Sequence, residues 1–209
     1  MNKTLSVIAA LCCAFSILLT GCESDDDDVD FGDNDPNLVA CVGDSIMAGY
    51  NCIGSPFSTR LAAKSGKNVL NFAQPGAVSS YGVSIIDGVL ARKPGYVCIM
   101  LGSNDAIQNK DLQSTKANIA AIIAACKSNN SVPIVGTPPR TAYGHLIFND
   151  RTKRVSQVVR EAASEQGAKL VDINSAFGDE PEIYLNPADG LHLSEEGGEL
   201  LADQFNGAL

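Results

Sequence analysis

Apolar and polar positions follow two patterns along this chain, one typical of buried strands and the other of amphipathic helices. Short runs rich in Val, Ile and Leu predict buried strands at residues 38–42, 69–72, 96–101, 132–135 and 170–173. Between them, apolar residues recur at helical spacing, at Ile119, Ile122, Ile123 and Cys126 and again at Val155, Val158, Val159 and Ala162. A last helix is predicted to begin near Ser194. Strands that alternate with helices predict an α/β fold, in which helices cover both faces of a five-stranded parallel sheet.

The first 21 residues have the pattern of an export signal. Lys3 is followed by an apolar run without charge, which is short for a helix that spans a bilayer. The run ends in Leu19-Thr20-Gly21-Cys22, which resembles a bacterial lipoprotein lipobox. The resemblance implies a signal peptide at residues 1–21 and a diacylglyceryl group on the Cys22 thiol. An ordinary secretory signal or an uncleaved anchor is the alternative.

Charge divides the rest of the chain into two parts. The protein has 209 residues and a net charge of -9, but residues 23–35 alone hold eight acidic residues and no basic one. Residues 22–37 are therefore predicted to be a lipidated, acidic and solvated tether, and residues 38–209 a single domain. The acidic net charge argues against a nucleic-acid partner, because phosphate binding needs a basic face. We expect the protein in the bacterial cell envelope, held to a membrane by the lipid on Cys22 and facing the periplasm or the cell exterior.

Four cysteines remain after the lipobox, at Cys41, Cys52, Cys98 and Cys126. Export permits disulfides, yet three of the four lie in apolar strand or helix patterns, where a free Cys commonly acts as a small hydrophobic residue. Their pairing stays open. Their spacing matches no metal site, and we expect neither metal nor cofactor.

Candidate catalytic residues lie where the predicted strands end. Ser45 follows the first strand in Gly43-Asp44-Ser45, Gly76 follows the second, and Asn104 follows the third in Gly102-Ser103-Asn104-Asp105. Ligands of parallel sheets bind beyond the carboxyl ends of the strands. Asp189 precedes His192 by three residues, so its carboxylate can turn back onto the imidazole and leave Nε2 free as a base.

The remaining polar residues near these strand ends have simpler interpretations. His145 has no carboxylate at a similar spacing and is interpreted as a surface or pocket-lining residue. Asp44 is expected to tie down the turn after the first strand, and Asp105 to do the same or to line the pocket.

Together these motifs resemble the SGNH hydrolases, also called the GDSL esterase and lipase family. Ser45, Gly76, Asn104 and His192 match the four letters of the name in the family's order, across residues 38–206. The resemblance implies a flavodoxin-like three-layer αβα sandwich, a catalytic triad of Ser45, Asp189 and His192, and an oxyanion hole formed by Ser45, Gly76 and Asn104. Residues 43–50 are most similar to the periplasmic thioesterase, arylesterase and lysophospholipase branch. Pro75 before the oxyanion Gly and Ala106-Ile107 after Asn104-Asp105 depart from that branch and leave the acyl-chain preference open.

The function predicted from these residues is hydrolysis of carboxylic esters. Aryl or short-chain acyl esters, lysophospholipids and thioesters are candidate substrates, and we expect a monomer. Three alternatives remain: a carbohydrate O-acetylesterase acting on a glycan ester, a non-catalytic binding domain on a lipid anchor, and an acyltransferase that uses the same triad.

Overall fold

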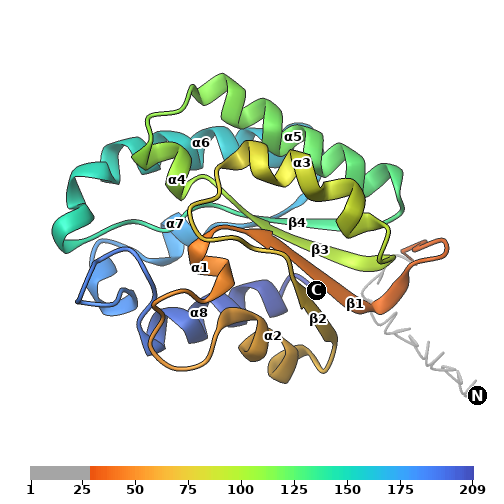
Figure 1. Ribbon diagram of the computed structural model, residues 1–209, viewed down its shortest axis with the longest axis horizontal. Helices are drawn as coiled ribbons and strands as arrows, with labels where there is room; N and C mark the ends of the chain where they lie inside the picture. Colours follow the sequence, from red (N-terminus) through yellow and green to blue (C-terminus); the bar gives the residue numbers. More distant parts are fainter. Residues whose placement is uncertain (1–28) are drawn as a thin grey trace, which may run out of the picture.

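The computed structural model describes residues 29–209 and contains a five-stranded sheet in which every pair of neighbouring strands is parallel. The strands are β1 (Asp35–Gly43), β2 (Asn68–Asn71), β3 (Pro94–Met100), β4 (Val132–Gly136) and β5 (Lys169–Val171). Their order across the sheet is β2-β1-β3-β4-β5 (Figure 1). This order is the flavodoxin-like arrangement, so the predicted fold class is confirmed.

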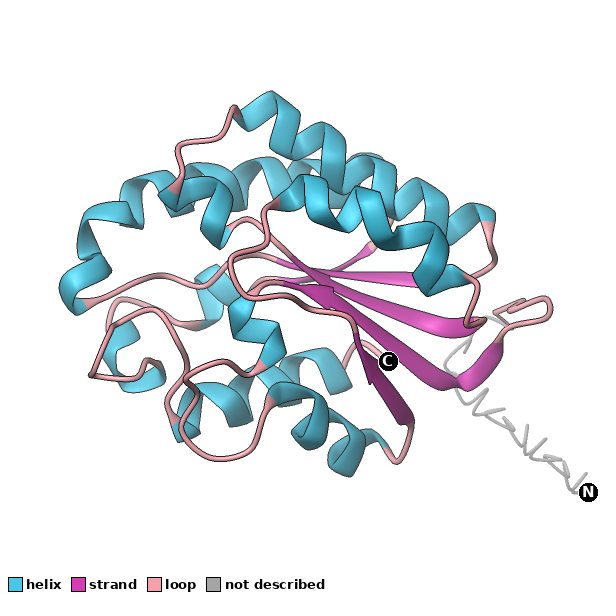
Figure 2. Cartoon of the chain, viewed as in Figure 1, coloured by secondary structure: helices cyan, strands magenta, loops and turns pink. Residues whose placement is uncertain are grey.

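Helices cover both faces of the sheet. One face carries α3 (Ser79–Leu90), α5 (Leu112–Ser128) and α6 (Asn149–Glu165), and the other carries α2 (Phe57–Ser65) and α8 (Glu195–Asn206) (Figure 1). The short elements are α1 (Ser45–Ala48), α4 (Ser103–Ile107), η1 (Tyr143–Phe148), α7 (Ile173–Ala176) and η2 (Pro181–Tyr184). Of these, α1, α4, η1 and α7 each follow a strand. Figure 2 shows α1, α4 and α7, which Figure 1 labels, among the loops at the carboxyl edge of the sheet.

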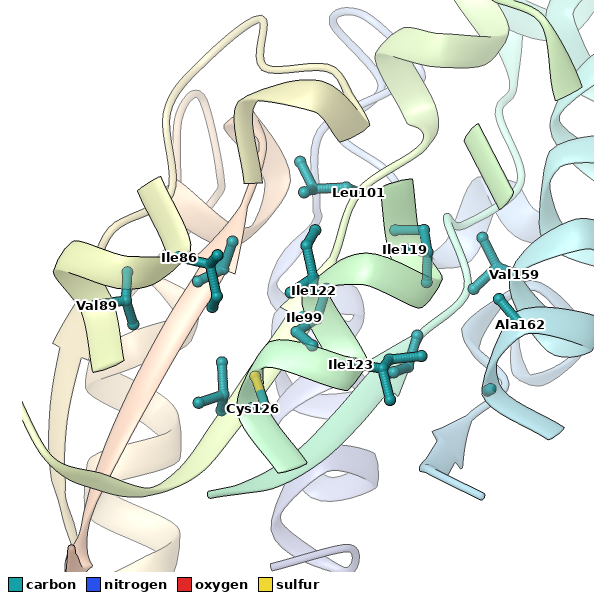
Figure 3. Packing of buried hydrophobic residues seen from close by; sticks show 14 of the residues in the cluster. Ile86, Val89, Ile99, Leu101, Ile119, Ile122, Ile123, Cys126, Val159 and Ala162 are labelled. Carbon is teal, nitrogen blue, oxygen red and sulfur yellow. The ribbon is translucent and has the colours of Figure 1, made fainter. Parts of the chain in front are cut away.

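Alternation along β1 divides the core into two layers. Val39 and Cys41 pack under α2 and α8, whereas Ala40 and Val42 pack under α3, α5 and α6. The helical stripe predicted on α5, Ile119, Ile122, Ile123 and Cys126, is fully buried in this second layer (Figure 3). Apolar residues on both faces of one strand are what a doubly covered parallel sheet requires.

The acidic N-terminal segment joins the domain earlier than the hydrophobic pattern indicates. β1 begins at Asp35 rather than at residue 38, and the Phe31 ring packs against the Tyr96 ring with centroids 5.2 Å apart. The buried Asn34 side chain donates to the Asn129 carbonyl oxygen at 2.6 Å. From Phe31 onward the predicted tether is therefore part of the folded domain, because aromatic packing and a buried amide hold it there.

β5 ends before the predicted strand does. Asp172 leaves the strand and caps α7, accepting a hydrogen bond from the Ser175 N–H. Ile173, predicted as the last strand residue, is instead the first residue of α7. The Ile173 side chain is buried in α7, as it would be at the end of a strand, so the apolar pattern could not distinguish a helix from a strand at this position.

The predicted signal peptide (residues 1–21) and the lipidation site Cys22 lie outside the described residues. Within residues 29–209, no helix has the length and apolar character needed to cross a membrane.

Candidate active site

Ser45 is held at the carboxyl end of β1 by a tight turn into α1. Asp44 caps the helix, and its Oδ1 accepts the Ile46 N–H at 3.0 Å. Gly43 is required before it, because a Cβ there would lie 2.6 Å from the Met47 Cβ and 2.9 Å from the Met100 carbonyl oxygen. The chain therefore passes close to β3, and Ser45 becomes the first residue of α1 with its N–H at the helix start.

His192 faces Ser45 across the edge of the sheet. The imidazole Nε2 lies 3.0 Å from the Ser45 Oγ, and Nδ1 lies 2.8 Å from the Asp189 Oδ2. The other oxygen of Asp189 accepts the N–H groups of Leu191 at 2.8 Å and of His192 at 2.9 Å. The carboxylate thus turns back onto the imidazole as the three-residue spacing predicts, and the structure brings Ser45, His192 and Asp189 together in one chain of hydrogen bonds.

The charge on Asp189 determines the proton positions in this chain of bonds. Burial acts to raise the pKa of Asp189, but hydrogen bonds from His192, Leu191 and Asn51 outweigh it and lower the pKa to about 2. Asp189 is ionised at neutral pH and can only accept, so Nδ1 of His192 carries the proton. With the proton on Nδ1, the lone pair of Nε2 faces the Ser45 hydroxyl.

Gly76 lies in a turn that explains the unexpected proline before it. The Ala77 N–H donates to the Gln74 carbonyl oxygen at 3.0 Å, which closes a turn with Pro75 and Gly76 at its centre. Gly76 has φ +80°, as the third position of a type II turn requires, and Pro is common at the second position of this turn. Pro75 thus fixes the loop that carries Gly76.

Asn104 connects the third strand to this same loop. It lies half-buried at the start of α4, and its Nδ2 donates to the Ala77 carbonyl oxygen at 3.0 Å. The adjacent Asp105 is buried and accepts the N–H and hydroxyl of Ser79 at 2.8 and 2.6 Å. The structure therefore brings Asn104 to the Gly76 loop, and one amide hydrogen of its Nδ2 remains for a ligand. Asp105 thus joins α4 to the start of α3, which agrees with the first of its two interpretations.

Asp44 is buried directly before Ser45 in the chain, and its carboxylate interacts with the Ser103 side chain. Burial raises the pKa of Asp44 to about 7, against the lowering effect of the hydrogen bond from the Ile46 N–H. Asp44 and Asp189, two carboxyl groups of one site, therefore differ widely in acidity because of their surroundings.

Several contacts of the site connect residues that sequence reasoning did not join. The Asn51 Nδ2 donates to the Asp189 Oδ2 at 2.5 Å, and the Tyr50 ring meets the His192 ring edge to face with centroids 5.2 Å apart. His145 does not reach the nucleophile's base; its Nδ1 lies 2.7 Å from the backbone carbonyl oxygen of Asp189. Asn51 and Asp189 are 138 positions apart, and no motif connects them.

The described part of the chain contains no cluster of metal-binding side chains, and its four cysteines are not paired. No group of three or more His, Cys, Asp or Glu residues there could hold a metal ion. Cys41, Cys52, Cys98 and Cys126 are free thiols. Burial raises the pKa of Cys126 to about 12, which suits its packing role on α5.

Comparison with known proteins shows similarity along most of the chain. The family model for the GDSL-like lipase/acylhydrolase family matches residues 41–200. The chain is 25% identical over 175 residues to the thioesterase 1/protease 1/lysophospholipase L1 of Escherichia coli strain K12, covering 80% of each protein.

Solved structures show the same fold. A lipase/acylhydrolase from Enterococcus faecalis superposes with a TM-score of 0.70 and 26% identity, covering 82% of this chain and 94% of the other. An acetylxylan esterase from Geobacillus stearothermophilus has a TM-score of 0.69 and 21% identity, over 82% of this chain and 93% of the other, and shares the fold.

Proposed function

The chain belongs to the GDSL-like lipase/acylhydrolase family and is an ester-bond hydrolase, and from this premise we propose that Ser45, His192 and Asp189 are its catalytic triad. The observation that carries the proposal is the hydrogen-bond chain from the Ser45 Oγ through the imidazole to the Asp189 carboxylate, with distances of 3.0 and 2.8 Å. This is the arrangement that activates a serine hydroxyl.

The proposed reaction has two halves, acylation of Ser45 and hydrolysis of the acyl-enzyme. The Ser45 proton passes to His192 in the first half, and a proton passes from His192 back to Ser45 in the second. Ser45 Oγ attacks the acyl carbon while Nε2 of His192 takes its proton, and the imidazolium then protonates the leaving alcohol as the ester bond breaks. Water, deprotonated by His192, attacks the acyl-enzyme and releases the acid, and the proton returns to Ser45. Asp189 stabilises the imidazolium in both halves and stays ionised.

The oxyanion is proposed to bind at the edge of the sheet between three donors. These are the N–H of Ser45, the N–H of Gly76 and the free amide hydrogen of Asn104. The type II turn at Gly76 and the contact between Asn104 and Ala77 support this, because both hold the donors in place before substrate binds.

A fluorophosphonate probe tests the nucleophile directly. We expect the probe to label the wild type and the Ser80→Ala variant, whose altered serine is exposed on α3, but not the Ser45→Ala variant. Labelling that persists in Ser45→Ala would disprove the assignment of the nucleophile. A wild type that takes no label would favour the non-catalytic binding domain.

The substrate is proposed to be an aryl or short-chain acyl ester, with lysophospholipids and thioesters as further candidates. The name of the E. coli relative, a thioesterase and lysophospholipase, supports this class. The second candidate is a carbohydrate O-acetylesterase, which is favoured by the shared fold of the acetylxylan esterase. Values of kcat/KM for p-nitrophenyl esters of increasing chain length, lysophospholipid and acetylated xylooligosaccharide separate the two. A preference for the acetylated sugar would overturn the first.

We also propose that the enzyme is exported to the bacterial cell envelope as a monomer and anchored by a lipid on Cys22. The apolar run before Leu19-Thr20-Gly21-Cys22 supports this proposal. Incorporation of a labelled fatty acid in the bacterial host should occur in the wild type and in Cys13→Ala, and should be lost in Cys22→Ala. Equal labelling of Cys22→Ala would contradict the anchor.

A further inference from the structure

We infer that Asn51 is a positioning residue for the Asp189–His192 pair. It holds the carboxylate against the imidazole and lowers the basicity of the imidazole. This inference rests on the proposed triad. Asn51 lies outside every motif that identifies the site, and it touches none of the reacting atoms.

The first step of the argument is the set of donors around Asp189. Its Oδ1 accepts two backbone N–H groups of its own loop, from Leu191 and His192. Its Oδ2 accepts from the imidazole of His192 at 2.8 Å and from Asn51 at 2.5 Å. Asn51 is therefore the donor to this carboxylate from outside the loop that carries the acid and the base. Without it, one oxygen is held by the imidazole alone.

The second step is that Asn51 itself is held firmly. Its backbone has φ +50°, a left-handed conformation that Asn adopts more readily than most residues. Its carbonyl oxygen accepts from the Nδ2 of the buried Asn186 at 2.9 Å. The backbone N–H of Asn186 in turn donates to the His192 carbonyl oxygen at 2.7 Å. Asn51 and His192 are thus both hydrogen-bonded to the buried Asn186, Asn51 to its side chain and His192 to its backbone N–H.

The third step is the connection to the nucleophile. Asn51 follows Tyr50, whose N–H donates to the Ser45 carbonyl oxygen at 2.9 Å and whose ring packs on the imidazole. Residues 50 and 51 therefore join the nucleophile to the acid and base from a single segment. Because a small misplacement of reacting groups strongly reduces rates, this connection bears on turnover.

The fourth step is electrostatic. A neutral N–H that donates to a carboxylate stabilises its charged form, so the carboxylate attracts a proton on the neighbouring imidazole less strongly. Among residues 29–209, the other titratable side chains against this pair are Tyr50 on the imidazole, His145 at the Asp189 carbonyl, and Tyr143, whose ring adjoins Gly190. None of these three contacts reaches the carboxylate oxygens, so within residues 29–209 Asn51 is the side chain that donates to them besides His192 itself.

Two substitutions separate the amide from the backbone around it. Asn51→Gly removes the amide and accepts φ +50° without strain. Asn51→Asp keeps the shape and replaces the donor by a second carboxylate. The matched control is Asn109→Gly, because Asn109 is also exposed, has φ +52°, and its side chain makes no hydrogen bond within residues 29–209.

The measurement is the pH dependence of kcat/KM on an aryl ester. We expect Asn51→Gly to lower turnover by roughly tenfold, and the acidic limb to move to higher pH, since the imidazole becomes more basic. The limb should move further in Asn51→Asp and stay in place in Asn109→Gly. An acidic limb at its wild-type pH in both Asn51 variants would overturn the inference, even where turnover falls, because a merely structural loss moves no limb.

Fluorophosphonate labelling keeps this inference separate from the proposed function. If the wild type takes label at Ser45 but the limb does not move, only the role of Asn51 is wrong. If the wild type takes no label at Ser45, the triad itself is wrong.

Discussion

The two aspartates nearest the nucleophile illustrate how burial and hydrogen bonding set the chemistry of single residues. Four donors surround Asp189 and keep it ionised, which gives His192 a fixed tautomer. Asp44 accepts a backbone hydrogen bond from Ile46, and burial raises its pKa to about 7. Asp44, directly before Ser45, therefore carries less negative charge at neutral pH than an ordinary carboxyl group.

Replacing Asp44 should change how stability depends on pH. The folded pKa of about 7 lies above the ordinary value of 3.8, so this group stabilises the fold below pH 4, and its contribution falls as pH rises to about 7. Asp44→Asn, which can still cap α1, should gain unfolding free energy relative to wild type across this window, by up to about 4 kcal/mol. Urea unfolding from pH 4 to pH 8 measures it, with the exposed Asp87→Asn as control. A difference that does not vary with pH would contradict the raised pKa.

Asn104 should matter for rate more than for stability. We expect Asn104→Ala to lower kcat on an aryl ester by about 10²- to 10³-fold, because a proposed donor to the oxyanion is lost. Its thermal midpoint should change little, since the side chain is half-buried and donates a single bond, to Ala77. Asn118→Ala is the matched control. The Asn118 amide donates to the Ser79 Oγ at 2.9 Å, and this hydrogen bond supports the fold rather than the proposed oxyanion hole. Wild-type turnover in Asn104→Ala would rule out its place in the oxyanion hole.

At the scale of the elements, the Asp172 side chain links α6, α7 and the segment after β4. Its carboxylate caps α7, pairs with Arg160 of α6 through two hydrogen bonds of 2.9 Å, and accepts the Thr137 hydroxyl beyond β4 at 2.9 Å. Burial acts to raise its pKa, but these partners outweigh burial and lower it to about 2. One side chain thus connects three elements at the carboxyl edge of the sheet.

Asp172→Ala should therefore destabilise the protein by about 1 to 2 kcal/mol at neutral pH, through the lost cap and ion pair. The folded pKa lies below 3.8, so the stabilisation is complete above that pH and disappears as pH falls towards 2. Denaturant titrations at pH 7 and pH 3 compare this variant with Asp179→Ala, whose carboxylate also pairs with an Arg but is 99% exposed. Equal losses for the two variants would be inconsistent with this account.

Elements also show how far the sequence could predict this molecule. The strand runs and the α5 stripe could be predicted because burial on both sheet faces leaves a continuous apolar signal. Ser45 and His192 could be placed because they stand at element ends next to recognisable spacings. Asn51 and Asn34 could not, because their partners, Asp189 and Asn129, lie far along the chain and only the folded topology brings them close. The end of β5 was missed because Ile173 is buried in helix and strand alike.

On the scale of the whole molecule, the N-terminal segment and the candidate active site lie at opposite ends of the sheet. Phe31 and Asn34 pack where strands begin, against Tyr96 and Asn129, whereas Ser45 and His192 meet where strands end (Figure 1). A lipid on Cys22 should thus leave the site unobstructed. We expect lipidated enzyme on vesicles and unlipidated Cys22→Ala enzyme to hydrolyse a soluble aryl ester with equal kcat/KM. A marked loss on vesicles would show that the bilayer covers the site.

The common direction of the parallel strands places the N-terminal segment and the candidate active site on opposite sides of the domain. In a parallel sheet every strand runs the same way, so the end by which the chain enters and the end that does the chemistry cannot coincide. With the proposed lipid anchor on Cys22, Ser45 would face away from the bilayer, towards the aqueous space. The enzyme's substrates would then arrive by diffusion from that space rather than laterally out of the anchoring leaflet.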